Sequence, residues 1–202
     1  MNLQITNMVP GLDAATRVAA AGFIQPLTPA LRMDVEQHLA EGALVQSVLA
    51  DGVVVGFAIY RLFEIATARV LYLAGIILDP KIQGRHLAAQ SITLAAAELH
   101  ATHLGLRTQS LRMWFVGERL TEGRWGPHPH RTFSAEEQVL GTELSERIHG
   151  GGRFPFLPGF YGTSLYGAKP IHRDTITQAW WDSICDFEAG DGVVCLGRLP
   201  SR

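Results

Sequence analysis

The feature that most constrains this chain is a predicted strand followed by a short turn and a helix. Residues 70–78 are an apolar run that predicts a buried strand, and residues 89–99 carry Ala and Leu at helical spacing. Between them lies the segment Asp79-Pro80-Lys81-Ile82-Gln83-Gly84-Arg85-His86-Leu87-Ala88. The first N–H groups of a helix have no partner within it, and the helix dipole adds partial positive charge there. The segment therefore predicts a phosphate site, beside which Lys81 and Arg85 add full positive charges.

The spacing of this turn excludes the two commonest phosphate motifs. It has neither the Gly-x-x-x-x-Gly-Lys pattern of a P-loop nor the Gly-x-Gly-x-x-Gly of a dinucleotide fingerprint. It instead resembles the acyl-CoA signature of the GCN5-related N-acetyltransferase (GNAT) superfamily, Gln/Arg-x-x-Gly-x-Gly/Ala. Gln83 takes the first position and Ala88 the last, whereas His86 stands where the family has its first Gly. The alternative interpretation of the turn is an ordinary connection between a strand and a capped helix.

The resemblance implies an α/β protein with a GNAT-like acyl-CoA N-acyltransferase fold. In that fold a mixed central sheet is flanked by helices, and here an extended C-terminal segment would be added. We expect one acetyltransferase-like domain over residues 1–202, with its core at about 1–120 and a variable acceptor-side segment at 121–202.

The resemblance also implies acetyl-CoA, or another acyl-CoA, as the co-substrate. The family pairs the pantetheine arm with strand backbone and holds the pyrophosphate in the turn, so the predicted cofactor-binding residues are Ile76, Ile77, Leu78, Gln83, Gly84, Arg85, His86, Leu87 and Ala88. The N–H groups of Ile77 and Leu78 would polarise the thioester carbonyl. The His86 side chain could crowd the pyrophosphate or, when protonated, bind it. Gly75 marks either a bulge in the strand or a relief of packing.

Catalytic residues are harder to place. Relatives often carry a Glu on the strand before the signature, but residues 70–78 contain no acid, and Glu64 is the nearest substitute. Relatives also place a Tyr after the fifth strand to protonate the departing thiolate. Tyr161 and Tyr166, in an aromatic segment at 154–166, are the candidates here. For all three residues, a turn or packing role is the alternative.

The function that the resemblance implies is direct transfer of an acetyl or other short acyl group to an amine of a small molecule or peptide. A catalytically silent acyl-CoA-binding or interaction module of the same fold is one alternative. An acyl-thioester enzyme of different chemistry, such as O-acyl transfer or decarboxylation, is another.

Composition argues against other classes of protein. The formal charge is −2, from 17 basic and 19 acidic residues without a basic run, which disfavours nucleic acid as a partner. A membrane span and a signal peptide are not expected, so a cytoplasmic location is predicted. Cys185 and Cys195 are predicted to be free thiols. His128 and His130 lack a nearby third ligand, so no metal is predicted. The segment at 154–166 is either a lid over the acceptor pocket or a subunit contact, and the second alternative would give a homodimer.

Hydrophobic periodicity predicts the remaining elements. Strands are expected at 3–9, 43–49, 53–63, 70–78, 105–108 and 193–196, with turns at 50–52 and 64–68. Helices are expected at 13–21, 33–40, 85–104, 112–120, 135–149 and 174–187. Asp13 is a predicted helix cap, Ser134 and Glu137 form a capping-box pattern, and the glycines at 150–152 should end a helix.

Overall fold

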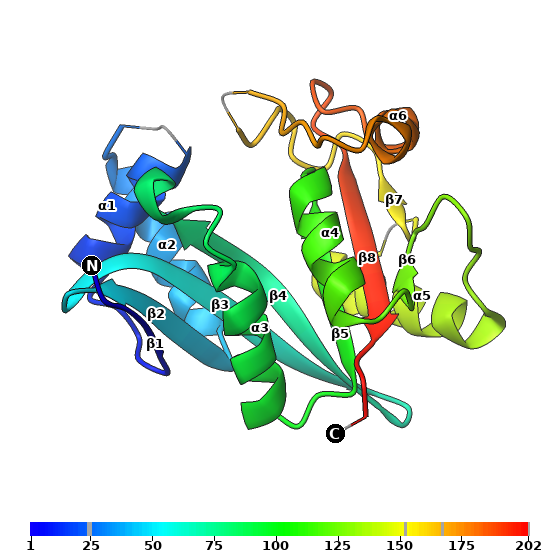
Figure 1. Ribbon diagram of the computed structural model, residues 1–202, viewed down its shortest axis with the longest axis horizontal. Coiled ribbons are helices and arrows are strands. Elements are labelled where there is room, and N and C mark those ends of the chain that lie inside the picture. Colours follow the sequence, from blue (N-terminus) through cyan, green and yellow to red (C-terminus); the bar gives the residue numbers. More distant parts are fainter. Residues whose placement is uncertain (24–25, 152, 167, 202) are drawn as a thin grey trace. The chain divides into compact units, whose positions relative to one another are not determined.

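The computed structural model describes residues 1–23, 26–151, 153–166 and 168–201. The chain forms two compact units (Figure 1). The first comprises Met1–Leu62 and Tyr72–Leu99, and the second comprises Phe63–Leu71 and His100–Arg202. The mixture of strands and helices confirms the predicted α/β class. None of the helices in the described residues combines the length and the apolar character that a membrane span requires.

The first unit is built on antiparallel strands with a turn and a helix after the last of them. Its elements are β1 (Leu3–Thr6), α1 (Leu12–Phe23), α2 (Pro29–Glu41), β2 (Leu44–Ala50), β3 (Val53–Ile65), β4 (Ala68–Leu78), η1 (Pro80–Ile82) and α3 (Leu87–Glu98). Strand β2 pairs with β1 on one side and with β3 on the other, antiparallel in both cases. The hairpin ends of β3 and β4, residues 63–71, count with the second unit.

The predicted turn between β2 and β3 is confirmed. Asp51 and Gly52 both have positive φ, 48° and 84°, which matches the two-residue hairpin turn that suits twisted strands. The next turn also lies within its predicted range, with Ala66 at a φ of 50°.

Two apolar clusters stabilise the first unit. Helices α1 and α2 pack on the sheet through the buried residues Ala15, Val18, Ala19, Ala20, Leu31, Val35, Val45, Phe57 and Ile59. A smaller cluster joins Val48 of β2 to Ile82 and Leu87. Because Ile82 and Leu87 are 2% and 4% exposed, they anchor both ends of a segment whose four central residues, 83–86, are exposed. Burial on either side thus fixes the turn that carries the predicted phosphate site.

Helix α3 is also tied to the sheet by buried polar groups. The Tyr60 hydroxyl lies 2.5 Å from Ser91 Oγ, and Ser91 Oγ donates to Gln46 Oε1 at 2.6 Å. Gln46 Nε2 in turn donates to Asn7 Oδ1 at 3.0 Å. Burial raises the pKa of Tyr60, so its hydroxyl stays protonated. The hydrogen bonds offset the cost of desolvating these groups, and the network fixes where α3 sits.

The second unit is built around a central strand near the end of the chain. Its elements are β5 (His103–Thr108), α4 (Leu111–Leu120), β6 (Trp125–Gly126), α5 (Ala135–His149), β7 (Phe156–Leu157), α6 (Thr175–Ile184) and β8 (Gly192–Arg198). Strand β8 pairs antiparallel with β5 along its full length, from His103↔Arg198 to Thr108↔Val193. The two-residue strands β6 and β7 also pair with β8.

Three tryptophans that are at most 2% exposed fill the interior of this unit: Trp114, Trp125 and Trp181. Trp114 Nε1 donates to the Pro127 carbonyl at 2.7 Å, and Trp181 Nε1 donates to the Gln109 carbonyl at 3.2 Å. The indole donors of Trp114 and Trp181 are therefore satisfied, whereas Trp125 Nε1 has no hydrogen-bond partner among the described residues. All three rings supply large apolar areas.

Most predicted elements are confirmed, and the helix at 135–149 has the predicted bounds. Its capping box is present, with Glu137 N donating to Ser134 Oγ and Ser134 N donating to Glu137 Oε2. Gly150 follows as a left-handed C-cap, and Gly152 lies outside the described residues. Local capping chemistry was thus sufficient to place this helix.

Several expectations need correction. Strand β1 ends at Thr6 rather than at residue 9, and helix α2 begins at Pro29 rather than at residue 33. Helix α3 is shorter than 85–104, because His86 and His100 on either side of it have positive φ, 59° and 50°. Asp13 lies inside α1 and pairs with Arg32 rather than capping the helix. Asp174 caps α6 from outside, so that helix starts one residue later and ends at Ile184. Strands β6 and β7 were not predicted, because two residues give no periodicity.

Candidate functional site

The turn after β4 begins with hydrogen bonds that fix its direction. Asp79 N donates to the Val55 carbonyl at 2.8 Å, and Asp79 Oδ1 accepts from Lys81 N at 2.9 Å. Pro80 starts the 3-10 turn η1, where its missing N–H costs nothing. The backbone therefore leaves β4 in a defined direction before it reaches residues 83–86.

Two of the predicted residues shape this turn from within. Gln83 Nε2 donates to the Leu78 carbonyl at 3.1 Å, so the Gln83 side chain joins the turn to the last residue of β4. Gly84 has a φ of +75°, which Gly adopts without steric cost, and a Cβ there would meet no atom within 4 Å. Arg85 is exposed and adds a positive charge beside the turn.

Helix α3 begins at Leu87 without a side-chain cap. His86 is the N-cap residue in the left-handed conformation, with φ 59° and ψ 14°, and its side chain makes no capping hydrogen bond. The Gln90 N–H donates to the His86 carbonyl at 3.1 Å and begins the helical hydrogen bonding. The preceding N–H groups, of residues 87–89, are therefore the ones that helix geometry leaves for another acceptor. With the helix dipole behind them, they can bind an anionic oxygen.

The last residues of β4 lie beside this turn and are partly buried. Ile77 packs in the cluster under α1 and α2, whereas Leu78 packs in the cluster with Ile82 and Leu87. The side chains of Ile77 and Leu78 thus serve opposite faces of the sheet, as strand alternation requires. A Cβ on Gly75 would meet no atom within 4 Å, so close packing does not require a glycine there.

A second group of interacting polar and aromatic side chains lies in the second unit, and the sequence did not predict it as a group. We call Arg107, His149, Phe160 and Tyr161 the Arg107 cluster. Arg107, on β5, donates from Nε to the Tyr161 hydroxyl at 2.9 Å and from Nη1 to His149 Nδ1 at 3.0 Å. Its guanidinium carbon lies 3.8 Å from the centroid of the Phe160 ring, a cation–π distance. Two hydrogen bonds and one stacked ring therefore fix the guanidinium.

Burial keeps both titratable neighbours of Arg107 uncharged near neutral pH. Burial, with the adjacent Arg107 cation as the smaller cause, lowers the pKa of His149 to about 4. Burial raises the pKa of Tyr161, and Arg107 partly offsets that rise. Arg107 is a donor only, so His149 Nδ1 accepts and the ring proton lies on Nε2. The cluster thus carries the single positive charge of Arg107.

The three predicted catalytic residues differ in their surroundings. Tyr161 belongs to the Arg107 cluster, whereas Tyr166 stacks on Phe187, and burial raises the pKa of Tyr166 to about 12. The Glu64 side chain is 70% exposed and accepts from Arg69 Nη1 at 3.0 Å. Glu64 is an exposed residue near the end of β3 rather than the turn residue that was the alternative. All three lie in the second unit, whereas Ile76 to Ala88 lie in the first.

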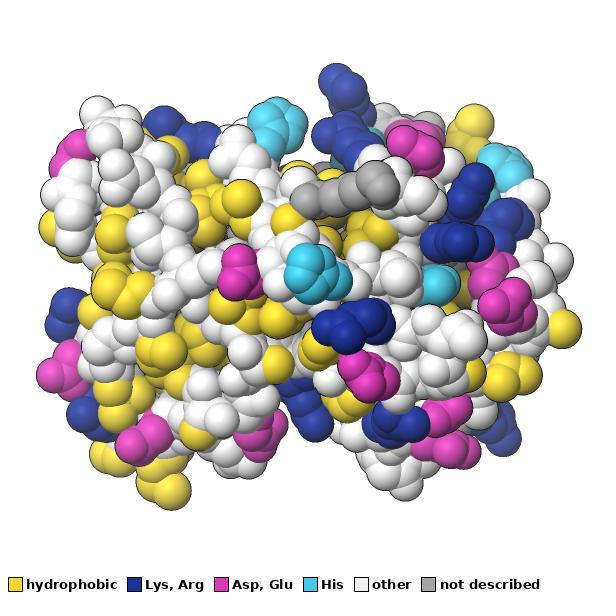
Figure 2. Space-filling view, turned by 90° about the horizontal axis from the view of Figure 1, so that it is seen from below, with side chains coloured by type: hydrophobic (Ala, Val, Ile, Leu, Met, Phe, Trp, Pro, Cys, Tyr) yellow, Lys and Arg dark blue, Asp and Glu magenta, His cyan; other side chains and the backbone are white. Residues whose placement is uncertain are grey.

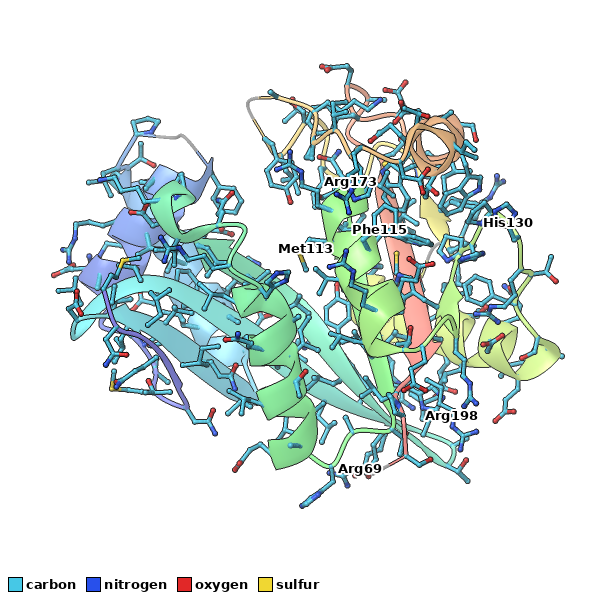
Figure 3. All side chains as sticks on the ribbon, in the orientation of Figure 1. Arg69, Met113, Phe115, His130, Arg173 and Arg198 are labelled. Carbon is cyan, nitrogen blue, oxygen red and sulfur yellow. The ribbon has the colours of Figure 1, made fainter. Side chains whose placement is uncertain are left out.

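The His-rich loop after β6 is occupied by contacts within the protein. His128 Nε2 lies 3.2 Å from Glu118 Oε1, and His128 Nδ1 accepts from His130 N at 3.1 Å. The His130 side chain extends from this loop (Figure 3). Within the described ranges, no group of three or more His, Cys, Asp or Glu side chains could hold a metal ion.

The two thiols are free and buried, as predicted. Burial raises the pKa of Cys185 to about 12 and that of Cys195 well above its usual value, so neither is a thiolate nucleophile. On the face shown in Figure 2, Lys and Arg side chains are interspersed with Asp and Glu side chains. That pattern agrees with the formal charge of −2.

The sequence gives one signal that could have found the Arg107 cluster. Arg107 is a charged residue inside the short apolar strand His103–Thr108, where a charge is costly unless it has partners. Nothing local identifies those partners, because His149 and Tyr161 lie 42 and 54 residues further along the chain.

Comparison with known families finds a match to one family model. The sequence model of the "Acetyltransferase (GNAT) family" matches residues 15–114, a range that includes β4, the turn and α3. The chain belongs to the GNAT acetyltransferase family. No curated protein matches it in sequence.

Solved structures of GNAT proteins share the fold at low identity. The ribosomal-protein-S18-alanine N-acetyltransferase of Escherichia coli has a TM-score of 0.52 at 15% identity, over 100% of this chain and 96% of that one. Aminoglycoside 6'-acetyltransferase type Ii has a TM-score of 0.52 at 10% identity, with coverage of 98% and 99%. The IAA acetyltransferase of Bacillus cereus ATCC 14579 gives 0.51 at 12% identity, with coverage of 98% and 100%. These likenesses confirm the predicted GNAT fold.

Proposed function

We propose that the protein is an acyl-CoA-dependent acyltransferase that transfers an acetyl or other short acyl group to an amine of a small molecule or peptide. The observation that carries this proposal is the uncapped start of α3 at His86, within the stretch that the GNAT family model matches. Free N–H groups at a helix start suit a pyrophosphate, and the exposed Arg85 adds a charge next to them.

The residues at the turn fit the diphosphate of CoA. The turn at 83–86 is exposed, and a Cβ at Gly84 would meet nothing within 4 Å, so the backbone is open to a ligand. In the proposed complex, residues Gln83 to Ala88 hold the diphosphate and the backbone of Ile76 to Leu78 pairs with the pantetheine arm. Acyl-CoA supplies an activated acyl thioester. The N–H groups of Ile77 and Leu78 would stabilise negative charge that develops on its carbonyl oxygen.

Of the two tyrosines, Tyr161 is better suited to protonate the departing thiolate. Its hydroxyl accepts from Arg107 Nε, and the adjacent cation lowers the cost of forming a phenolate. Tyr166 has no cation among the causes of its shift, and burial raises its pKa to about 12. In the transfer, the uncharged amine nitrogen bonds to the acyl carbon and the carbon–sulfur bond breaks. The nitrogen gives up one proton to solvent, and the departing sulfur takes one proton from the acid.

The aromatic segment and the cellular setting complete the proposal. Phe156 and Phe160 are 38% and 40% exposed, whereas Phe154 packs in the core of the second unit. A segment that is anchored at one end and partly exposed at the other suits a lid over an acceptor pocket. We propose one acetyltransferase domain that works in the cytoplasm, where buried thiols such as Cys185 stay reduced.

Ligand-induced stabilisation tests the proposal. The melting temperature is measured with acetyl-CoA, CoA and ATP at millimolar concentration. A ligand at a hundredfold excess over its Kd adds about 2.7 kcal/mol of stability. We expect a rise with both CoA species and none with ATP; no rise with any of them would overturn CoA binding.

Turnover then separates an enzyme from a silent binding module. Release of free thiol from acetyl-CoA in the presence of an amine panel, with the product identified by mass, is the expected result. CoA binding without thiol release would favour the silent module, and a product acylated at a hydroxyl would favour O-acyl transfer.

A further inference from the structure

The Arg107 cluster contains a cation whose hydrogen-bonding capacity is only partly used. A guanidinium has five N–H donors, and the bonds to Tyr161 and His149 account for two of them. Among the described residues, no carboxylate forms an ion pair with Arg107. A partly buried cation without a counter-ion costs free energy, so its retention needs a reason.

The neighbours of Arg107 orient it rather than neutralise it. Phe160 stacks on the guanidinium plane, and Gly192 of β8 leaves room beneath, since a Cβ there would lie 3.3 Å from Arg107 Cδ. The two hydrogen-bond partners accept from Nε and Nη1, which leaves the Nη2 edge of the fork to a ligand. A planar fork held in this way matches a carboxylate, which can accept two parallel hydrogen bonds.

A second donor without a partner lies two residues along the chain. Gln109 is 2% exposed, and its Oε1 accepts from Leu165 N at 2.9 Å, in the same segment as Tyr161. Its Nε2 has no hydrogen-bond partner within the described part of the chain. Buried amide donors normally have acceptors. Two donor groups in one region, both incompletely satisfied, indicate a ligand rich in acceptor oxygens.

We infer that the Arg107 cluster binds the carboxylate of the acceptor, so that the acceptor is an amino carboxylate. The acceptor role rests on the proposed acyl transfer, whereas carboxylate binding can be measured without it. A monoanion matches the single charge of the cluster better than a phosphate dianion does, because His149 and Tyr161 are uncharged near neutral pH.

Binding is tested first, on the full chain without CoA. The probes are N-acetylglycine and its uncharged counterpart N-acetylglycinamide, titrated by calorimetry and by the NMR signal of the Arg107 Nε–H. Hydrogen bonds to a charged group contribute about 1.5–3 kcal/mol, so the acid should bind about 10- to 100-fold more tightly than the amide. Equal affinities would overturn the inference.

Variants separate a binding role from a structural one. Arg107→Met should abolish the preference for the acid, and Arg107→Lys, which keeps the charge but loses the fork, should retain part of it. Arg119→Met is the matched control, because Arg119 is an exposed arginine of α4 in the same unit. This variant should prefer the acid over the amide as strongly as wild type does. If Arg107→Met does not fold, Arg107→Lys alone decides: an unreduced preference for the acid would refute the fork.

Turnover distinguishes failure of this inference from failure of the proposed function. With acetyl-CoA present, glycine and larger amino acids should be acetylated in preference to their amides, and Arg107→Met should raise KM for the amino acid without changing KM for acetyl-CoA. Turnover with equal use of acids and amides would refute the carboxylate site and leave the proposed acyl transfer standing. Carboxylate binding without any turnover would support the carboxylate site and refute the proposed acyl transfer.

Discussion

Replacing His86 with glycine should stabilise the protein, although it removes a side chain. His86 has φ 59° and ψ 14°, which is left-handed backbone. A non-glycine residue in this conformation destabilises the folded state by about 1–2 kcal/mol. Glycine avoids that cost but loses about 0.5–1 kcal/mol, because it gives up more conformational freedom on folding. The net gain is about 0.5–1 kcal/mol. For a chain of 202 residues, that corresponds to a rise of about 1–4 °C in melting temperature.

The assay is urea denaturation of wild type, His86→Gly and His86→Ala under identical conditions. His86→Ala keeps the backbone strain and removes the imidazole, so it should not stabilise the protein. A rise with both variants would mean that the imidazole itself, rather than the backbone, is unfavourable. A fall with His86→Gly would refute the strain argument, because it would show that the His86 side chain contributes more than its conformation costs.

Three further perturbations test other parts of the structure. Burial and Arg107 lower the pKa of His149 from 6.5 to about 4, so the unfolded state binds a proton at a higher pH than the folded state does. The free energy of unfolding should therefore fall by about 1–2 kcal/mol, after allowance for solvent screening, as pH falls from 6.5 to 4. The urea midpoints at pH 7 and pH 4.5 should differ less in His149→Gln than in wild type. Gly117→Ala should cost about 1–3 kcal/mol, measured as a lower urea midpoint, because its Cβ would lie 2.2 Å from Trp125 Cζ2. Tyr161→Phe should lower kcat by about 100-fold with an unchanged Kd for CoA, and an unchanged kcat would exclude Tyr161 as the acid.

The turn after β4 could be predicted from sequence because every signal in it is local. An apolar run, a proline, a glycine and a helical pattern follow one another within residues 70–99, and the structure places them as a strand, a 3-10 turn and a helix. The one error was to extend α3 across Arg85 and His86. The spacing of apolar residues does not report that a single histidine has left-handed backbone, so the predicted start of the helix is too early.

The Arg107 cluster could not be predicted because its members meet only through the tertiary fold. Arg107 lies on β5, His149 ends α5 and Tyr161 follows β7, and it is the pairing of β5 and β7 with β8 that brings these elements together. Only the tyrosine was singled out, and for a role suggested by family resemblance. The arginine that gives this tyrosine its chemistry emerges only once the packing of the second unit is known.

Strained backbone at His86 also bears on what its side chain does. A residue in an unfavourable conformation at the proposed ligand-binding turn points to a function for that residue, since glycine would hold the turn at lower cost. If the imidazolium binds the diphosphate, wild-type affinity for CoA should rise about fivefold from pH 8 to pH 5.5, beyond any rise in His86→Gly. His86→Gly is the necessary control, because it reports the titration of CoA itself. Parallel pH profiles for the two proteins would exclude the phosphate contact and leave His86 as a steric restriction on the cradle, in which case His86→Gly should bind CoA more tightly at every pH.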